Sequence, residues 1–249
     1  MPATRHPLEG PTKHSLVHRE RIDWHYHDEH QLVYPESGVL RISTDAGSWV
    51  VPPQRAVWIP AGVAHSHRAH GPTRMLTLVF TVNPLRLHQP AVLSVSPLLR
   101  EVIIALTGAE LDARQRRNIE RVALDQLRID PARPFSLPQP ADDRLRAIAA
   151  VLADNPADER GLAALGRAVG ASDRTLSRLF RTQTGMSFPQ WRAQLRLQHA
   201  LELLATGTTV TAVATQSGYH SCSAFIETFR QAFGQTPGNY QRHLRSGAA

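Results

Sequence analysis

The sequence has one cysteine, Cys222, one lysine, Lys13, and no long uninterrupted apolar run. A single cysteine excludes an intrachain disulfide framework and a cysteine-rich metal site, and it favours a cytoplasmic protein. A membrane-spanning helix needs about 18 or more consecutive apolar residues, and no segment approaches that length. The first fifteen residues lack the apolar centre of a signal peptide. We therefore expect neither export nor contact with a membrane.

Because lysine is nearly absent, arginine carries almost all of the positive charge. The 28 Lys and Arg residues against 21 Asp and Glu give a formal net charge of +7 and a pI of about 10.6. This excess suits a nucleic-acid partner, but it also suits an ordinary soluble protein. The length of 249 residues with 42% hydrophobic residues predicts one or two domains with real cores and excludes a disordered chain. The nature of the partner therefore has to come from motifs.

A helix-turn-helix pattern occurs twice in the last third of the chain, at residues 162–180 and 210–234. Each copy has a short amphipathic helix, a glycine, a small polar residue and a second amphipathic helix. Glycine permits the positive φ of the turn, and a serine oxygen can accept hydrogen bonds from the free amides of the next helix. A long predicted helix over 188–207 joins the copies and sets their distance. The turns and caps are Gly170 with Ser172, and Gly218 with Ser221.

The second helix of each copy is expected to enter the major groove of DNA. The helix predicted over 173–183 has three arginines on its polar face, which suit guanine edges and phosphates. The helix predicted over 222–232 is less basic, and its glutamate suits cytosine N4. We expect the first helix to supply more affinity and the second to adjust specificity. The candidate DNA-contacting residues are Arg174, Ser177, Arg178, Arg181, Cys222, Ser223, Glu227 and Arg230.

The segment 16–85 alternates short β-forming runs with turn residues, which predicts an all-β barrel or sandwich. Within it, His25 and His27 are two residues apart, so on a strand both imidazoles face one side. Gln31 follows four residues after His27, and a Pro-x-Gly-x-x-His segment ends at His65.

This arrangement resembles the two motifs of the cupin family. The resemblance places His25, His27, Gln31 and His65 at positions that bind a divalent metal, and such a donor set suits Zn, Fe, Mn or Ni. Neutral Gln31 stands where the family has a carboxylate, and the glycines before the first histidine are missing. The alternative is a barrel that binds an organic effector or nothing.

The rest of the chain divides by composition. Residues 1–15 are polar and rich in Pro and Gly, which predicts a flexible arm. Two amphipathic helices are expected within 86–130, where they either cover the barrel or offer a seam to a second subunit. Four prolines lie in or next to the linker predicted at 131–141. The fold class is therefore α+β with two domains, and the all-α domain at 142–246 carries both helix-turn-helix units.

The string GYHSCSAFIETFRQAFGQTPGNY, with the residues before it, resembles the DNA-binding domain of AraC-type transcription regulators over about 142–243. The β segment, over about 16–82, is similar to the cupin-like sensor domains attached to many of them. The resemblance implies a sequence-specific regulator, an activator like most of the family, and not an enzyme. It also places the base-contacting positions on Arg174, Ser177, Arg178, Cys222, Ser223 and Glu227.

The partners that this reading implies are double-stranded promoter DNA, a small-molecule effector, RNA polymerase and a second copy of the chain. Two other functions remain open at this point. One is a metal-dependent cupin enzyme with an appended DNA-binding module. The other is an architectural DNA-binding protein without effector control.

Overall fold

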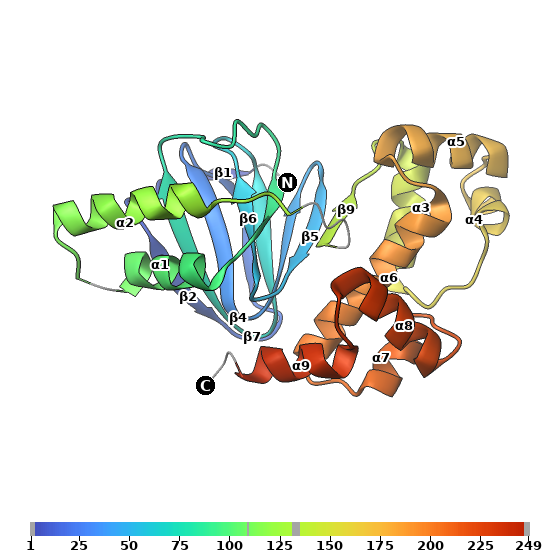
Figure 1. The fold of residues 1–249 in the computed structure, drawn as a ribbon. Coiled ribbons are helices and arrows are strands. Elements are labelled where there is room, and N and C mark those ends of the chain that lie inside the picture. The colour runs from blue at the N-terminus through green and yellow to red at the C-terminus, as the bar shows by residue number, and fades with distance from the viewer. Residues whose placement is uncertain (1–2, 109, 131–134, 247–249) are drawn as a thin grey trace. The chain divides into compact units, whose positions relative to one another are not determined.

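The computed structural model describes residues 3–108, 110–130 and 135–246. The chain divides into two compact units, one within the segment that ends at Phe135 and one mainly over Ser136–Gln241. The first contains the strands β1 to β8 and two helices, and the second is helical apart from the short strand β9 (Ser136–Pro138), as Figure 1 shows. The predicted α+β class is confirmed.

Two long antiparallel strands form the centre of the first unit. They are β4 (His30–Thr44) and β7 (His65–Phe80), whose pairing runs from His30 opposite Phe80 to Thr44 opposite His65. Strands β2 and β3 pair with β7, and β6 pairs with β4 and β8. The remaining bounds are β1 (Thr4–Arg5), β2 (Thr12–Leu16), β3 (Arg21–Tyr26), β5 (Gly47–Val51), β6 (Arg55–Ile59) and β8 (Ala91–Ser94).

The pairing of β4 with β7 is interrupted near Gly38, where the register shifts between Ser37 and Val39. Gly38 has φ of 76°, and a Cβ there would lie 2.4 Å from the Pro72 carbonyl oxygen. Only glycine fits so close an approach at a positive φ. The irregularity bends the strand pair in the middle of the sheet.

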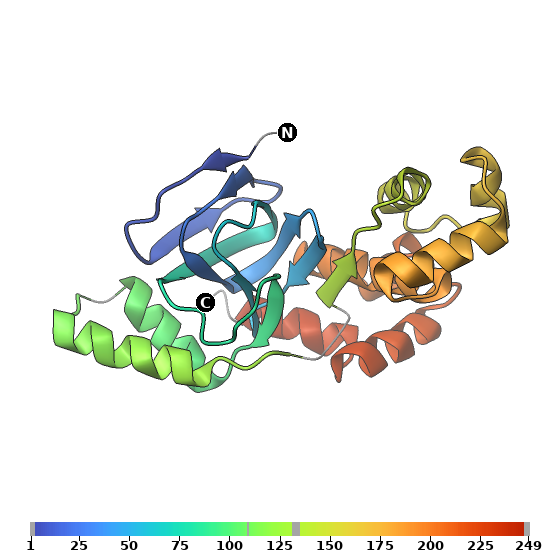
Figure 2. The ribbon, with the colours of Figure 1, turned by 90° about the horizontal axis from the view of Figure 1, so that it is seen from above.

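Helices α1 (Pro97–Gly108) and α2 (Ala113–Gln126) lie side by side against this sheet in both views (Figures 1 and 2). α1 buries Leu99 and Ile103 in one cluster with the sheet residues Leu32, Trp58 and Leu78. The helices predicted within 86–130 therefore cover the sheet, which was one of the two roles expected for them.

Three segments of the first unit differ from prediction. Residues 4–5 pair with β3 and residues 12–16 pair with β7, so a flexible arm over 1–15 is wrong for these residues. The segment assigned to helices also begins with a strand, because Ala91–Ser94 pairs with β6. Each of these strands is too short to show a clear period, and backbone pairing with distant residues decides its structure.

The C-terminal unit contains two helix-turn-helix units joined by one long helix, as predicted. Its helices are α3 (Asp143–Asp154), α4 (Leu162–Ala168), α5 (Asp173–Thr184), α6 (Phe188–Ala205), α7 (Val210–Gln216), α8 (Cys222–Phe233) and the part of α9 (Pro237–Ser246) up to Gln241. The Oγ of Ser172 accepts a hydrogen bond from the amide of Thr175, and that of Ser221 from the amide of Ala224. Gly170 has φ of 65° and so forms the expected left-handed turn.

α6 is buried on several sides, which suits a helix that holds both units. Trp191 in its first turns packs on Phe180 of α5, with ring centroids 5.7 Å apart. In the second helix-turn-helix unit, Phe225 and Phe229 of α8 are fully buried, and Tyr240 of α9 packs on Phe229. Ala224 lies one position before this buried stripe and is exposed.

Candidate metal-binding and DNA-reading sites

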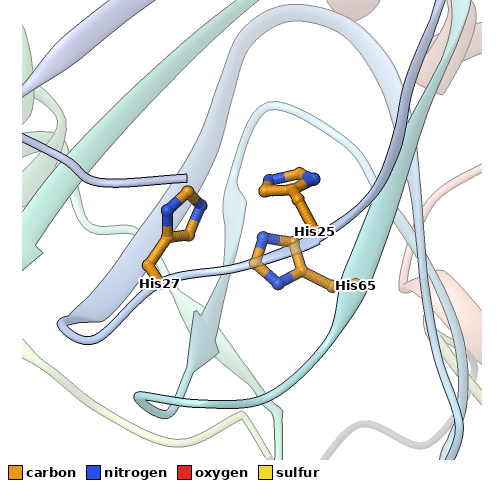
Figure 3. Close-up of side chains that lie close together, drawn as sticks. All are labelled: His25, His27 and His65. Atoms are coloured by element: carbon orange, nitrogen blue, oxygen red, sulfur yellow. The ribbon is translucent and has the colours of Figure 1, made fainter. Parts of the chain in front are cut away.

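Three of the four predicted metal ligands meet inside the first unit. His25 and His27 come from the end of β3 and the residue after it, and His65 begins β7 directly opposite His25. One candidate ligand atom from each imidazole lies within 4.8 Å of the others, and Figure 3 shows the three rings converging. Nitrogens that share a tetrahedral zinc ion lie roughly 3.4 Å apart, given a Zn–N bond of about 2.0–2.1 Å. A small movement of the side chains would therefore close the site around an ion.

Backbone carbonyls select the same tautomer for all three rings. The Nδ1 of His25 donates to the Asp23 carbonyl at 2.6 Å, that of His65 donates to Val63 at 2.8 Å, and that of His27 donates to His6. Because a carbonyl oxygen only accepts, each Nδ1 holds the proton and each Nε2 keeps its lone pair. The Nε2 atoms of His27 and His65 are buried and bond to no residue that the structure describes. Metal-binding histidines typically donate their other ring N–H to a carbonyl or carboxylate in this way.

Burial also keeps these imidazoles neutral. It lowers the pKa of His65 to about 3, and it lowers the pKa of His25 and His27 against the weaker effect of their carbonyl hydrogen bonds. Only a neutral imidazole can donate a lone pair to a metal. The rings are therefore in the ligand form at neutral pH.

The fourth predicted ligand, Gln31, is buried near the start of β4, and its Oε1 bonds to no described residue. Two further histidines stand next to the three rings. The buried ring of His67 lies 5.1 Å from that of His65, and the ring of His6 stacks on His25 at 5.0 Å. The two-residue spacing from His65 already places His67 on the same strand face. Nothing in the sequence marks His6, because the pairing of β1 with β3 brings it there.

The buried histidines predict that the protein loses stability as the pH falls from 7 to 5. In the unfolded chain these imidazoles take up protons near pH 6.5, whereas burial lowers the pKa of His65 and His67 in the folded state. The unfolded state then binds more protons, so the free energy of unfolding decreases with falling pH. His65→Gln, which does not titrate, should show a smaller decrease in urea unfolding. Equal free energies at pH 7 and pH 5 for the wild type would contradict this.

The candidate DNA-contacting face of α5 is exposed and positively charged. The side chains of Arg174, Arg178 and Arg181 are exposed, and none of them has a hydrogen bond or ion pair among the described residues. Ser177 is half-buried, and its Oγ donates to the Asp173 carboxylate. The three guanidinium groups are therefore available to an outside partner.

The face of α8 has a different electrostatic character. Glu227 accepts hydrogen bonds from Gln231 Nε2 and Arg230 Nη2, each at 2.9 Å, and these bonds hold its pKa below the usual range. The positive charge of Arg230 is thus balanced within the helix. Ser223 is exposed and Cys222 is half-buried at the start of α8.

Comparisons with known proteins identify the domains that contain these residues. Residues 165–243 match the model of a helix-turn-helix domain, and residues 14–81 match the model of a cupin domain. The transcriptional regulator NimR of Escherichia coli K12 is 35% identical over 226 residues, which cover 88% of this chain and 82% of NimR. The transcriptional regulator RipA of Corynebacterium glutamicum is 37% identical over 121 residues, 49% of this chain and 37% of RipA.

Among solved structures, a DNA-binding transcriptional dual regulator from Escherichia coli K-12 is 31% identical, covering 42% of this chain and 95% of that chain with a TM-score of 0.39. Within the described residues, no helix is long and apolar enough to span a membrane. The relatives are named as transcription regulators, which places the chain in this class and not among the cupin enzymes. The chain belongs to the AraC family of helix-turn-helix transcription regulators and carries an N-terminal cupin domain.

Proposed function

We propose that the chain binds two neighbouring short DNA sequences, here called boxes, one in contact with α5 and one with α8. In this proposal α5 supplies most of the affinity and α8 adjusts specificity. The observation that carries this is a contrast of charge: three arginines on α5 have no side-chain partner among the described residues, whereas Glu227 and Arg230 on α8 pair with each other. Arginine forks suit guanine edges and phosphates, whereas a carboxylate accepts from cytosine N4. The proposed contacts are Arg174, Ser177, Arg178, Arg181, Cys222, Ser223, Glu227 and Arg230.

The two helix-turn-helix units over 142–246 are called the reader below. The proposed regulation couples the reader to the cupin domain through the segment 131–141. We expect an effector to bind the domain and change DNA affinity, which requires that it bind the two functional states differently. We also propose that the chain acts in the cytoplasm, contacts RNA polymerase and activates transcription, as the resemblance to the family implies. A homodimer is also proposed, because Val122 and Ile129 expose apolar surface around α2 and because two readers on one DNA gain affinity together.

We further propose that the cupin domain holds one divalent metal on His25, His27 and His65, with Gln31 as the oxygen donor. The donor set is uncharged, which favours Zn²⁺ or Ni²⁺ over the harder ions that prefer carboxylates. When bound, the metal would supply a Lewis-acid centre to which an oxygen-bearing effector could attach. The protein's own residues supply the tautomers, the burial and the neutral rings that such a site needs.

The experiment that tests the reader is selection of bound duplexes from a random DNA pool with the full chain. Recovered sequences should contain two boxes, one under each helix. Addition of Zn²⁺ or a chelator to the binding assay then tests whether the cupin domain affects DNA affinity.

A further inference from the structure

One arginine in the middle of α6 contacts parts of both helix-turn-helix units. The Nε of Arg196 donates to the Pro156 carbonyl at 2.9 Å, and its Nη2 donates to the Asp158 carbonyl at 3.1 Å. Both carbonyls lie in the loop 155–161, between α3 and α4 of the first unit. Arg196 thus holds the loop that leads into α4 against the connecting helix α6.

The turn of the second unit packs on the same guanidinium. A Cβ on Gly218 would lie 2.8 Å from Arg196 Cζ and 2.9 Å from the Ala157 Cα, so the turn touches both the arginine and the loop. Gly218 has φ of 75°, which a larger residue would adopt only with strain. His220 of the turn also lies near the loop, with its Nδ1 3.6 Å from Glu159 Oε1. We call this three-way contact of Arg196, the loop and the turn the junction.

The chemistry of the junction makes its geometry specific. Arg196 is half-buried, and loss of hydration lowers its pKa below the usual value. A desolvated cation is stable only when its donors are satisfied, and here two loop carbonyls accept hydrogen bonds from the guanidinium. A planar guanidinium can serve two carbonyls in fixed directions, whereas a lysine ammonium cannot reproduce this fork. The loop and the turn must therefore stay in one arrangement around α6.

We propose that Arg196 is a positioning residue that fixes α5 relative to α8 and so sets the number of base pairs between the two DNA boxes. The proposal rests on the two-box reading proposed above. Helix α6 alone fixes the separation along its axis, but the units packed on it could still tilt. Inserting one base pair moves a box by about 3.4 Å and turns it by roughly 34°, so even a small tilt would change which spacing fits.

The first test measures how strongly spacing affects affinity. Duplexes recovered by selection are compared with duplexes that have one base pair inserted or deleted between the boxes. The wild type should bind the altered duplexes at least about tenfold more weakly, the cost of roughly one lost base contact. In Arg196→Ala this penalty should fall below about threefold, while affinity for a duplex with the first box alone stays unchanged.

Arg192→Ala is the matched control. Arg192 lies one turn earlier on α6, donates to the Arg160 carbonyl at 2.8 Å and stacks over Phe188, within the first unit. Its loss should leave the spacing penalty unchanged. An unchanged penalty in folded Arg196→Ala would overturn the proposal. If that variant does not fold, Arg196→Lys replaces it and should lose part of the penalty, and a full wild-type penalty there would count against Arg196.

A second test does not depend on DNA. Cys222 at the start of α8 is the only cysteine, so a spin label there can be paired with one at Thr182→Cys on α5. Pulsed electron–electron double resonance on the doubly labelled full chain measures the distance between the two labels. The distribution should be narrow without a further change and in Arg192→Ala, and broad in Arg196→Ala. Equal widths would overturn the proposal. If the wild type shows no spacing penalty but the widths differ as expected, the two-box reading fails while the junction stands.

Discussion

Replacing Arg178 with alanine is expected to weaken binding to the selected duplex by about 1–3 kcal/mol, roughly 5- to 150-fold. The side chain is exposed on α5 and has no partner among the described residues. Its removal should therefore leave the stability of the free protein unchanged. Its neighbours are held by a well-formed scaffold, because Ser172 caps the helix and Phe180 is fully buried beneath it. The loss should therefore appear in DNA affinity and not in stability. Fluorescence anisotropy with a labelled duplex at several salt concentrations measures it.

Glu227→Ala is the comparison that tests the asymmetry between the helices. Its carboxylate is already bonded to Arg230 and Gln231, so removal should cost less affinity and relax the base preference at one position of the second box. Arg146→Ala on α3, whose side chain is paired with Asp143, controls for loss of a positive charge elsewhere. Equal losses for Arg178→Ala and Glu227→Ala would contradict the assignment of affinity to α5.

His65→Ala is expected to reduce the affinity of the protein for Zn²⁺ by more than about a hundredfold. Altering a residue that only hydrogen-bonds to a metal ligand already lowers metal affinity roughly 10- to 100-fold. His65 would be a direct ligand with its lone pair on Nε2. The ring is 1% exposed, and its low pKa makes it available without loss of a proton at pH 7. Equilibrium dialysis of the full chain should give one Zn²⁺ per wild-type chain.

His88→Ala provides the control for metal binding, because His88 is an exposed histidine of the same unit. It should bind Zn²⁺ as the wild type does. Wild-type affinity in His65→Ala would show that the metal, if bound, lies elsewhere on the chain. A wild-type protein that binds no Zn²⁺ or Ni²⁺ would contradict the metal proposal and favour a domain that binds an organic effector directly.

The helices of the reader were predicted well because their signals are local. The long helix predicted over 188–207 is observed at Phe188–Ala205, and the caps at Ser172 and Ser221 have the predicted hydrogen bonds. A serine that meets a free amide three residues later needs no information from the rest of the fold. The helix at Pro237–Ser246 was not assigned, since its buried Tyr240 is explained only by packing on α8.

The N-terminal unit shows what local signals omit. His25 and His27 share a strand face by spacing, and the cupin motif added His65, so the three rings could be predicted to meet. His6 could not, because parallel pairing of Thr4 with His25 places it there. The Arg196 junction was missed for the same reason, since its partners lie about 40 residues before it and 22 residues after it in the chain.

Selection of bound duplexes from a random pool tests the central claim most directly, because it asks whether two helices of one chain read two boxes. We expect a recovered motif with two boxes about one helical turn, roughly 10 base pairs, apart. Arg178→Ala should weaken the base preference in the first box, and Glu227→Ala should change the base preference at one position of the second box. A motif with a single box, or one whose second box is unaffected by any change on α8, would contradict the claim that both units read bases.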